Sequence, residues 1–362
     1  MAERGQGDYP EQTMPTRREF ISSVVGATLL GGCSSKSPKK QPRAASPAAP
    51  PPRADPGAGD EAPPTRREDA RPALEVPRDD ALANIRKHET PGPDLVEVTG
   101  NDAGKMLALA IPKFSGDKPL VRRGDRVVIT PNFALARGQG TGVATEASLV
   151  KAMIQYCEQA EARDITVLDH SYHPAPRAFR VNGAFEAVQG TSARLISPWS
   201  PDQYVVINDF QSGKLHREEL KWQAVPETLL RCDVLINMPV FKHHRDAGMS
   251  GAVKKLMGCI WRRAVYHDVD LHACIGELAA VLKPTFTVMD AIQVLATNGP
   301  DGPGKVKPVN RLLLSADAVL ADTYACSYLD MAPKEIAYLK HAADLGAGLM
   351  DVKGADVKRI VS

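Results

Sequence analysis

Short apolar runs alternate with amphipathic stretches along most of this chain. Six short apolar runs, most of them rich in β-branched residues, predict strands at 126–130, 165–168, 204–207, 234–238, 285–289 and 311–314. Apolar residues three and four positions apart predict helices at 148–162, 271–282, 316–329 and 334–345. Strands that alternate with helices are typical of an α/β fold. We therefore expect a mostly parallel, Rossmann-like sheet flanked by helices.

The first 33 residues have a different pattern. Arg17 and Arg18 precede Phe20-Ile21, and a short apolar stretch then ends in Leu-Gly-Gly-Cys at Cys33. A charged start, an apolar stretch and a small-residue end are the parts of a processed N-terminal segment. The arginine pair resembles a twin-arginine signal, and the last four residues resemble the lipobox of bacterial lipoproteins. These resemblances imply export by the twin-arginine machinery. They also imply a lipid on Cys33 that anchors the protein to the membrane, on the periplasmic side of the cell envelope.

Residues 34–80 are dominated by Pro, Ala, Ser and Arg. Such a composition cannot bury enough apolar surface to fold, so it predicts a disordered tether. The folded α/β domain is then expected at 90–352. No run in the sequence approaches the roughly 18 apolar residues of a membrane-spanning helix.

Composition excludes several classes of protein. The chain has 362 residues and a formal charge of only +2, which gives no electrostatic basis for nucleic-acid binding. Beyond Cys33 it has five cysteines and no CxxC pair, so it carries no iron–sulfur cluster motif and no zinc ribbon. We expect most of these thiols to be buried as small apolar groups.

Histidines and a lysine follow two of the predicted strands. Lys242 and His244 come just after 234–238, and His173 lies in the loop after 165–168. In open α/β sheets, ligands bind at the carboxyl ends of the strands. Side chains from these two strand ends are therefore expected to converge, and His173 and His244 are candidates for proton transfer. The alternative is that both are surface histidines in polar loops.

Four further positions suggest cofactor binding. Gly251 and Lys254 stand at an apparent helix start, which suits a phosphate or a carboxylate. Asp290 is expected to end a strand, and Gly302 belongs to the Gly-rich loop NGPDGPG, which matches neither the Walker nor the Rossmann spacing. Solvated lysines and an ordinary loop are the alternatives.

A metal site is a further possibility. His267 and His272, with Asp268 and Asp270, are candidate metal ligands. No tight spacing such as HExxH supports zinc among them.

Most of the folded chain resembles family 362 of the domains of unknown function, a bacterial and archaeal family. The resemblance rests on INMPVFKHH (236–244), SGAVKKLMG (250–258), MDAI (289–292), NGPDGPG (298–304) and SADAVLAD (315–322), in this order. One departure is Lys255, where the family usually has Asn.

A more distant similarity links HRDAGMSGAVKKLMG and the following YH to nickel-dependent lactate racemases. It implies that Lys254 carries a nickel-pincer nucleotide, that His267 ligates nickel and that His244 is one acid/base group. His173 falls where the racemases have a Gly-Thr-His loop. The racemases' Thr-Arg-Pro is replaced by Thr130-Pro131-Asn132, so one substrate-binding arginine is missing.

Two hypotheses follow. The first is an exported enzyme of racemase or oxidoreductase type, which acts on a small carboxylate with a metal or nucleotide cofactor, and in which Lys242 and Lys254 hold an anionic group. The second is a non-catalytic envelope lipoprotein that captures a small anionic ligand or a partner with Lys242 and Lys254.

Overall fold

The computed structural model describes most of the chain beyond its N-terminal segment. The described residues are 70–77, 81–88, 92–208, 210 and 220–362. Arg17, Arg18 and Cys33 lie outside these ranges. Within them, no helix combines the length and the apolar character needed to cross a membrane.

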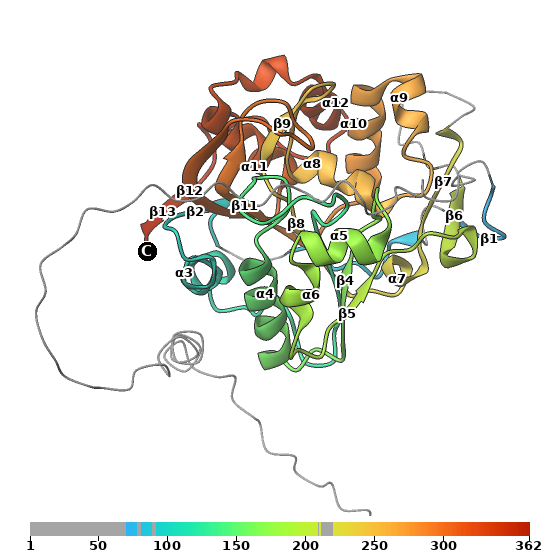
Figure 1. Cartoon of the computed structure of the whole chain (residues 1–362), viewed down its shortest axis with the longest axis horizontal. Helices are drawn as coiled ribbons and strands as arrows, with labels where there is room; N and C mark the ends of the chain where they lie inside the picture. The colour runs from blue at the N-terminus through green and yellow to red at the C-terminus, as the bar shows by residue number, and fades with distance from the viewer. Residues whose placement is uncertain (1–69, 78–80, 89–91, 209, 211–219) are drawn as a thin grey trace, which may run out of the picture.

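An eight-stranded sheet forms the centre of the fold (Figure 1). From edge to edge its strands are β13 (Val357–Val361), β2 (Leu95–Thr99), β12 (Val306–Ser315), β11 (Phe286–Leu295), β8 (Val234–Met238), β3 (Arg126–Pro131), β4 (Asp164–Leu168) and β5 (Arg194–Ile196). Strand β12 is antiparallel to both of its neighbours, and all other adjacent pairs are parallel. The predicted mostly parallel sheet is thus confirmed, with one reversed strand.

Helices cover both faces of this sheet (Figure 1). On one face lie α3 (Ala103–Ser115), α4 (Ala147–Gln159), α5 (Ala175–Val181) and α6 (Ala184–Val188). On the other lie α8 (Ala252–Lys255), α10 (Leu271–Val281), α11 (Ala318–Ala325) and α12 (Ala337–Asp344). Each set buries its apolar side against the strands in its own core cluster, so the fold is the predicted α/β class. The five cysteines in the described ranges are all free and buried, as expected from their sequence context.

A second sheet of three strands stands beside the first one. It contains β1 (Leu74–Pro77), β6 (Tyr204–Asn208) and β7 (Trp222–Pro226). The predicted strand at 204–207 therefore exists, but it is not part of the main sheet. The tether prediction does not hold for β1, because this segment of 34–80 pairs in parallel with β6.

Other element boundaries differ from the sequence pattern for local reasons. The helix expected at 316–329 is α11 followed by a 3₁₀ turn at Cys326–Leu329. The helix expected at 334–345 starts later, at α12, because a 3₁₀ turn at Pro333–Glu335 precedes it. The predicted domain end at 352 was too early, because β13 completes one edge of the sheet by pairing with β2.

The order of the strands creates a crevice where the candidate site lies. Strand β3 pairs with β4 on one side and with β8 on the other. The chain continues from β4 to β5 on one side, and β8 pairs with β11 on the other. The loops after β3 and β8 therefore separate at the carboxyl edge, which is where ligands enter such sheets.

Candidate functional site

A cavity of about 810 Å³ lies at this carboxyl edge. Six candidate residues from the sequence line it: His173, Lys242, His244, Lys254, His267 and Asp268. They come from the loop after β4, from the short strand β9 (Lys242–His244), from α8 and from α9 (Val265–Val269). The other polar or aromatic residues of the lining are Asn132, Asp169, Tyr172, Ser250, Lys255 and Arg263. The expected convergence of strand-end side chains on one place is therefore observed.

The start of α8 is held by a buried carboxylate. Asp322 on α11 accepts hydrogen bonds from the backbone N–H groups of Ala252 at 2.5 Å and Val253 at 3.0 Å. Burial raises the pKa of Asp322 to about 7. A Cβ atom on Gly251 would stand 2.1 Å from Asp322 Oδ1, so only glycine leaves room for this contact. Gly251 does not line the cavity. Its role is structural, because its lack of a side chain allows Asp322 to cap α8, the helix that carries Lys254.

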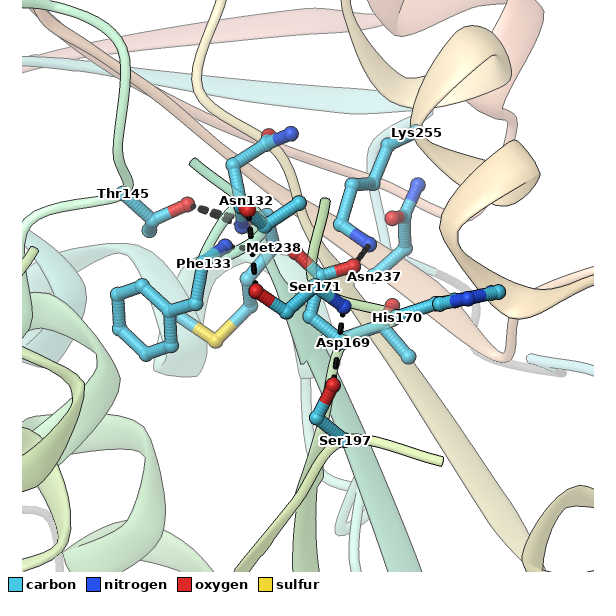
Figure 2. A network of polar contacts seen from close by, with 12 residues as sticks. Asn132, Phe133, Thr145, Asp169, His170, Ser171, Ser197, Asn237, Met238 and Lys255 are labelled. Carbon is cyan, nitrogen blue, oxygen red and sulfur yellow. Dashed lines mark hydrogen bonds and ion pairs between the residues drawn. The ribbon is translucent and has the colours of Figure 1, made fainter. Parts of the chain in front are cut away.

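A buried ion pair joins α8 to the loop after β4 (Figure 2). Lys255 Nζ lies 3.0 Å from Asp169 Oδ1, and both side chains are only 2% exposed. The other oxygen of Asp169 accepts a 2.7 Å bond from the backbone N–H of Phe133, in the loop after β3. Asp169 therefore connects three segments that form the cavity wall. A charged pair buried this deeply is costly to break, because either partner alone would be an uncompensated buried charge.

Lys242 is buried without a carboxylate partner among the described residues. Its side chain is only 3% exposed, and its Nζ donates a 2.6 Å bond to the carbonyl of Val143. Burial lowers the pKa of Lys242 to about 7. The charged groups that act on it are Asp169, Lys254, Lys255 and Asp301. The amine is thus present in both protonation states near neutral pH.

Lys254 and Arg263 add positive character to the same cavity. The Nζ of Lys254 contacts Met257 Sδ at 3.5 Å, and burial, with the charge of Arg263, lowers the pKa of Lys254 to about 8. Arg263 donates a 2.9 Å bond to the carbonyl of His170. In the described part of the chain, no carboxylate forms an ion pair with Lys242, Lys254 or Arg263. Three cationic groups therefore face one cavity, and the natural complement of such a lining is an anion.

The imidazoles of His173 and His244 are fixed by backbone donors. His173 Nδ1 accepts a 3.1 Å bond from the N–H of Ala136. His244 Nδ1 accepts bonds from the N–H groups of Asp246 at 3.2 Å and Ala247 at 3.3 Å. A neutral imidazole whose Nδ1 accepts a bond carries its proton on Nε2.

Both rings are neutral at physiological pH. Burial lowers the pKa of His244 to about 3, and the charge of Lys254 adds to this effect. The pKa of His173 is also lowered by burial and by Arg177. Each ring therefore presents an N–H donor to an oxygen atom of a ligand.

His267 lines the cavity from α9 at its exposed side. Across the described ranges, no group of three or more His, Cys, Asp or Glu side chains could hold a metal ion. His272 instead stacks on Tyr338, with ring centroids 6.2 Å apart, and Asp270 caps α10 through the N–H of Ala273 at 3.1 Å. A bare metal ion thus lacks a ligand set among the described residues.

Two expected contacts lie elsewhere. Asp290 does not end its strand, because β11 continues to Leu295, and the carboxylate is buried where it accepts bonds from the N–H groups of Glu146 and Ile292. Gly302 does not line the cavity either; its carbonyl accepts a 3.3 Å bond from Arg137. Only Pro300 of the Gly-rich loop reaches the lining.

The sequence patterns missed several residues of the cavity. Asn132 follows β3 directly and Tyr172 lies in the loop after β4, so their position after a strand was an available signal. The pairing of Lys255 with Asp169 spans 86 residues and leaves no local trace in the sequence.

Comparison with known proteins defines the class first. The family described as "Domain of unknown function (DUF362)" matches residues 127–327, which is more than half of the chain, and the chain belongs to this family. A thylakoid-associated protein of Synechocystis sp. is 24% identical over 257 residues, covering 68% of this chain and 76% of that protein.

A solved structure with a distant likeness is the lactate racemase apoprotein from Thermoanaerobacterium thermosaccharolyticum. Its TM-score is 0.37 at 13% identity, over 70% of this chain, and this chain spans 58% of that protein. A likeness this distant says nothing about substrate or cofactor.

The capping role of Gly251 leads to a steric prediction. Gly251→Ala should lower the melting temperature by several degrees, because the new Cβ collides with Asp322 Oδ1 and loosens the cap of α8. The control is Gly138→Ala, where the nearest atom to a new Cβ is 3.9 Å away. Thermal unfolding followed by circular dichroism measures both. Equal melting temperatures for the two variants would contradict the assigned role.

The burial of Lys242 leads to a prediction about pH. Its ordinary pKa is 10.5 and its folded pKa is about 7, so between these values the unfolded chain binds more protons and stability should rise with pH. Below pH 7 the folded state must bury the charge. Lys242→Met should therefore stabilise the protein most at pH 6, and the gain should shrink toward pH 10. Urea unfolding at several pH values tests this, with Lys334→Met, an exposed lysine, as the control. A gain that does not change with pH would rule the assignment out.

Proposed function

We propose that this protein is an enzyme that binds a small carboxylate in the cavity and moves a proton on it. The observation that carries the proposal is the cavity lining itself. Lys254 and Arg263 provide positive charge without described carboxylate partners, Lys242 provides an amine whose pKa is about 7, and neutral His173 and His244 provide N–H donors beside them. An anionic ligand would stabilise both cations, and the donors would bind its oxygen atoms.

In this proposal Lys242 is the proton acceptor. An amine whose pKa lies near neutral pH is unprotonated in a large fraction of molecules and still basic enough to take a proton. Its Nζ is held by the Val143 carbonyl, so the base has a fixed position. The histidines then act as hydrogen-bond donors that stabilise negative charge on a substrate oxygen, a role that neutral imidazoles perform in other enzymes. This differs from the acid/base role expected for them from the sequence, because their Nδ1 atoms already accept backbone bonds.

A nucleotide-type cofactor fits the same lining. Lys254 and Arg263 are suited to its phosphate or carboxylate groups, and His267 is the imidazole that would complete the coordination of a cofactor-bound metal such as nickel. When bound, the metal of such a cofactor would act as a Lewis acid on a substrate oxygen. The protein's own part would be to bind the substrate carboxylate, to remove the proton at C2 of a 2-hydroxy acid through Lys242, and to exclude water.

The proposal predicts both binding and exchange. A small carboxylate such as lactate or oxalate should raise the melting temperature of protein purified from its native host. The substitution Lys254→Met should remove most of this increase. With a panel of 2-hydroxy acids in D₂O, it should exchange the hydrogen at C2 with solvent. Lys242→Met should reduce the exchange rate by at least 100-fold, and Lys334→Met should change neither result.

The outcomes separate the two hypotheses from the sequence. Anion binding that depends on Lys254, with no exchange for any acid in the panel, would support the non-catalytic binding protein. No stabilisation by any anion would contradict both. Metal analysis and intact mass of the same sample test the cofactor, because an adduct on Lys254 or bound nickel is expected for the enzyme.

We also propose that the protein is exported and lipid-anchored at the cell envelope. The support is the arginine pair Arg17-Arg18 and the resemblance of the residues up to Cys33 to a lipobox, together with a similar protein that is named for its association with thylakoids.

Cell fractionation tests the anchor. Cys33→Ser should move the protein from the membrane fraction to the soluble fraction, because the lipidated thiol is lost. Replacing Cys157, which is buried in α4, by Ala should leave the protein in the membrane fraction. An unchanged distribution for the Cys33 variant would exclude the lipid anchor.

A further inference from the structure

Tyr172 is unusual among the residues of the cavity. It is 65% exposed although it lines the cavity. Seven large apolar or aromatic side chains are well exposed in the described ranges, and of these only Tyr172 reaches the cavity. An exposed aromatic ring at the wall of a polar cavity leaves apolar surface in water that a planar ligand would cover.

The position of this ring is fixed by its surroundings. The N–H of Tyr172 donates a 2.8 Å bond to the carbonyl of Ala134, and the neighbouring Ser171 hydroxyl bonds to the same loop. The ring of His173 meets the Tyr172 ring edge to face, with centroids 5.7 Å apart and an interplanar angle of 86°. A tyrosine side chain has only two main rotatable bonds, so little entropy remains to be lost when a ligand stacks on it.

Arg263 completes the arrangement. Its guanidinium carbon lies over the Tyr172 ring, 5.8 Å from the centroid, while one nitrogen bonds to the carbonyl of His170. A guanidinium beside an aromatic ring offers a planar, cationic surface that also stacks on π systems. Tyr172 and Arg263 together thus present an aromatic and a cationic surface beside the basic groups of the cavity.

We propose that Tyr172 and Arg263 form a subsite for the planar aromatic ring of an anionic ligand, a nucleobase. The phosphate of the same ligand would bind at Lys254. This rests on the proposed function, because it takes the anion site from it. The subsite adds the class of ligand to that function. A mononucleotide should bind more tightly than the corresponding sugar phosphate, because only the mononucleotide has a ring that stacks on Tyr172.

The test compares ligands that differ only in the ring. Isothermal titration of the full chain with AMP, ribose 5-phosphate and inorganic phosphate measures the three affinities. Wild-type protein should bind AMP at least tenfold more tightly than ribose 5-phosphate, since base–aromatic stacking is a substantial part of such binding. Tyr172→Ala should remove this preference and leave ribose 5-phosphate unchanged. Tyr172→Phe should keep it, because the ring remains.

A matched control is Phe185→Ala, which removes another exposed aromatic ring, on α6, that does not line the cavity. It should leave all three affinities unchanged. Equal affinities of AMP and ribose 5-phosphate for wild type, or a preference that survives Tyr172→Ala, would overturn the ring subsite but leave the anion site standing. Failure of all three ligands to bind would overturn the subsite and the anion site together.

Discussion

The buried pair of Lys255 and Asp169 is the interaction on which the cavity wall depends. It lies where the loops after β3 and β4 meet α8, and all three segments carry residues of the cavity. Gly258 also leaves room for it, because a Cβ there would stand 2.6 Å from both Asp169 Oδ1 and Lys255 Nζ. Because Lys255 and Asp169 neutralise each other, this pair is a structural part of the wall. The other cations of the cavity can therefore bind a ligand.

Those remaining cations put function and stability in opposition. Lys242 and Lys254 are held in a partly apolar cavity, and among the described residues no carboxylate forms an ion pair with either of them. Burial lowers the pKa of both amines, because the charged form of a buried amine is unfavourable when no ligand is bound. Sites of this kind are stabilised by what they bind, so ligand affinity and apparent stability should be linked.

Regular patterns were enough to predict the strands of the sheet centre and the positions of His173, Lys242, His244 and Lys254 after them. These features depend on residues that are close together in the sequence. A β-branched run forms a strand, and the polar residues that follow it lie at the carboxyl edge of the sheet. Long-range contacts were not predictable in this way. The assignment of β6 to a second sheet depends on β1 and β7, and the role of Gly251 depends on Asp322, 71 positions away in the sequence. Asp290 was misplaced because the end of β11 could not be located from its sequence.

Strand β13 has a consequence for the association of molecules with one another. It covers one side of β2, whose residues Leu95 to Val98 are buried, and it presents the exposed charges of Lys358 and Arg359 at the rim of the sheet. Lys358 pairs with Asp356 and Arg359 with Glu97, and charged side chains on an edge strand are a common protection against pairing with the sheet of another molecule. Loss of these last residues would bare a regular, apolar edge with free backbone donors and acceptors. The C-terminal strand thus protects the protein against edge-to-edge aggregation.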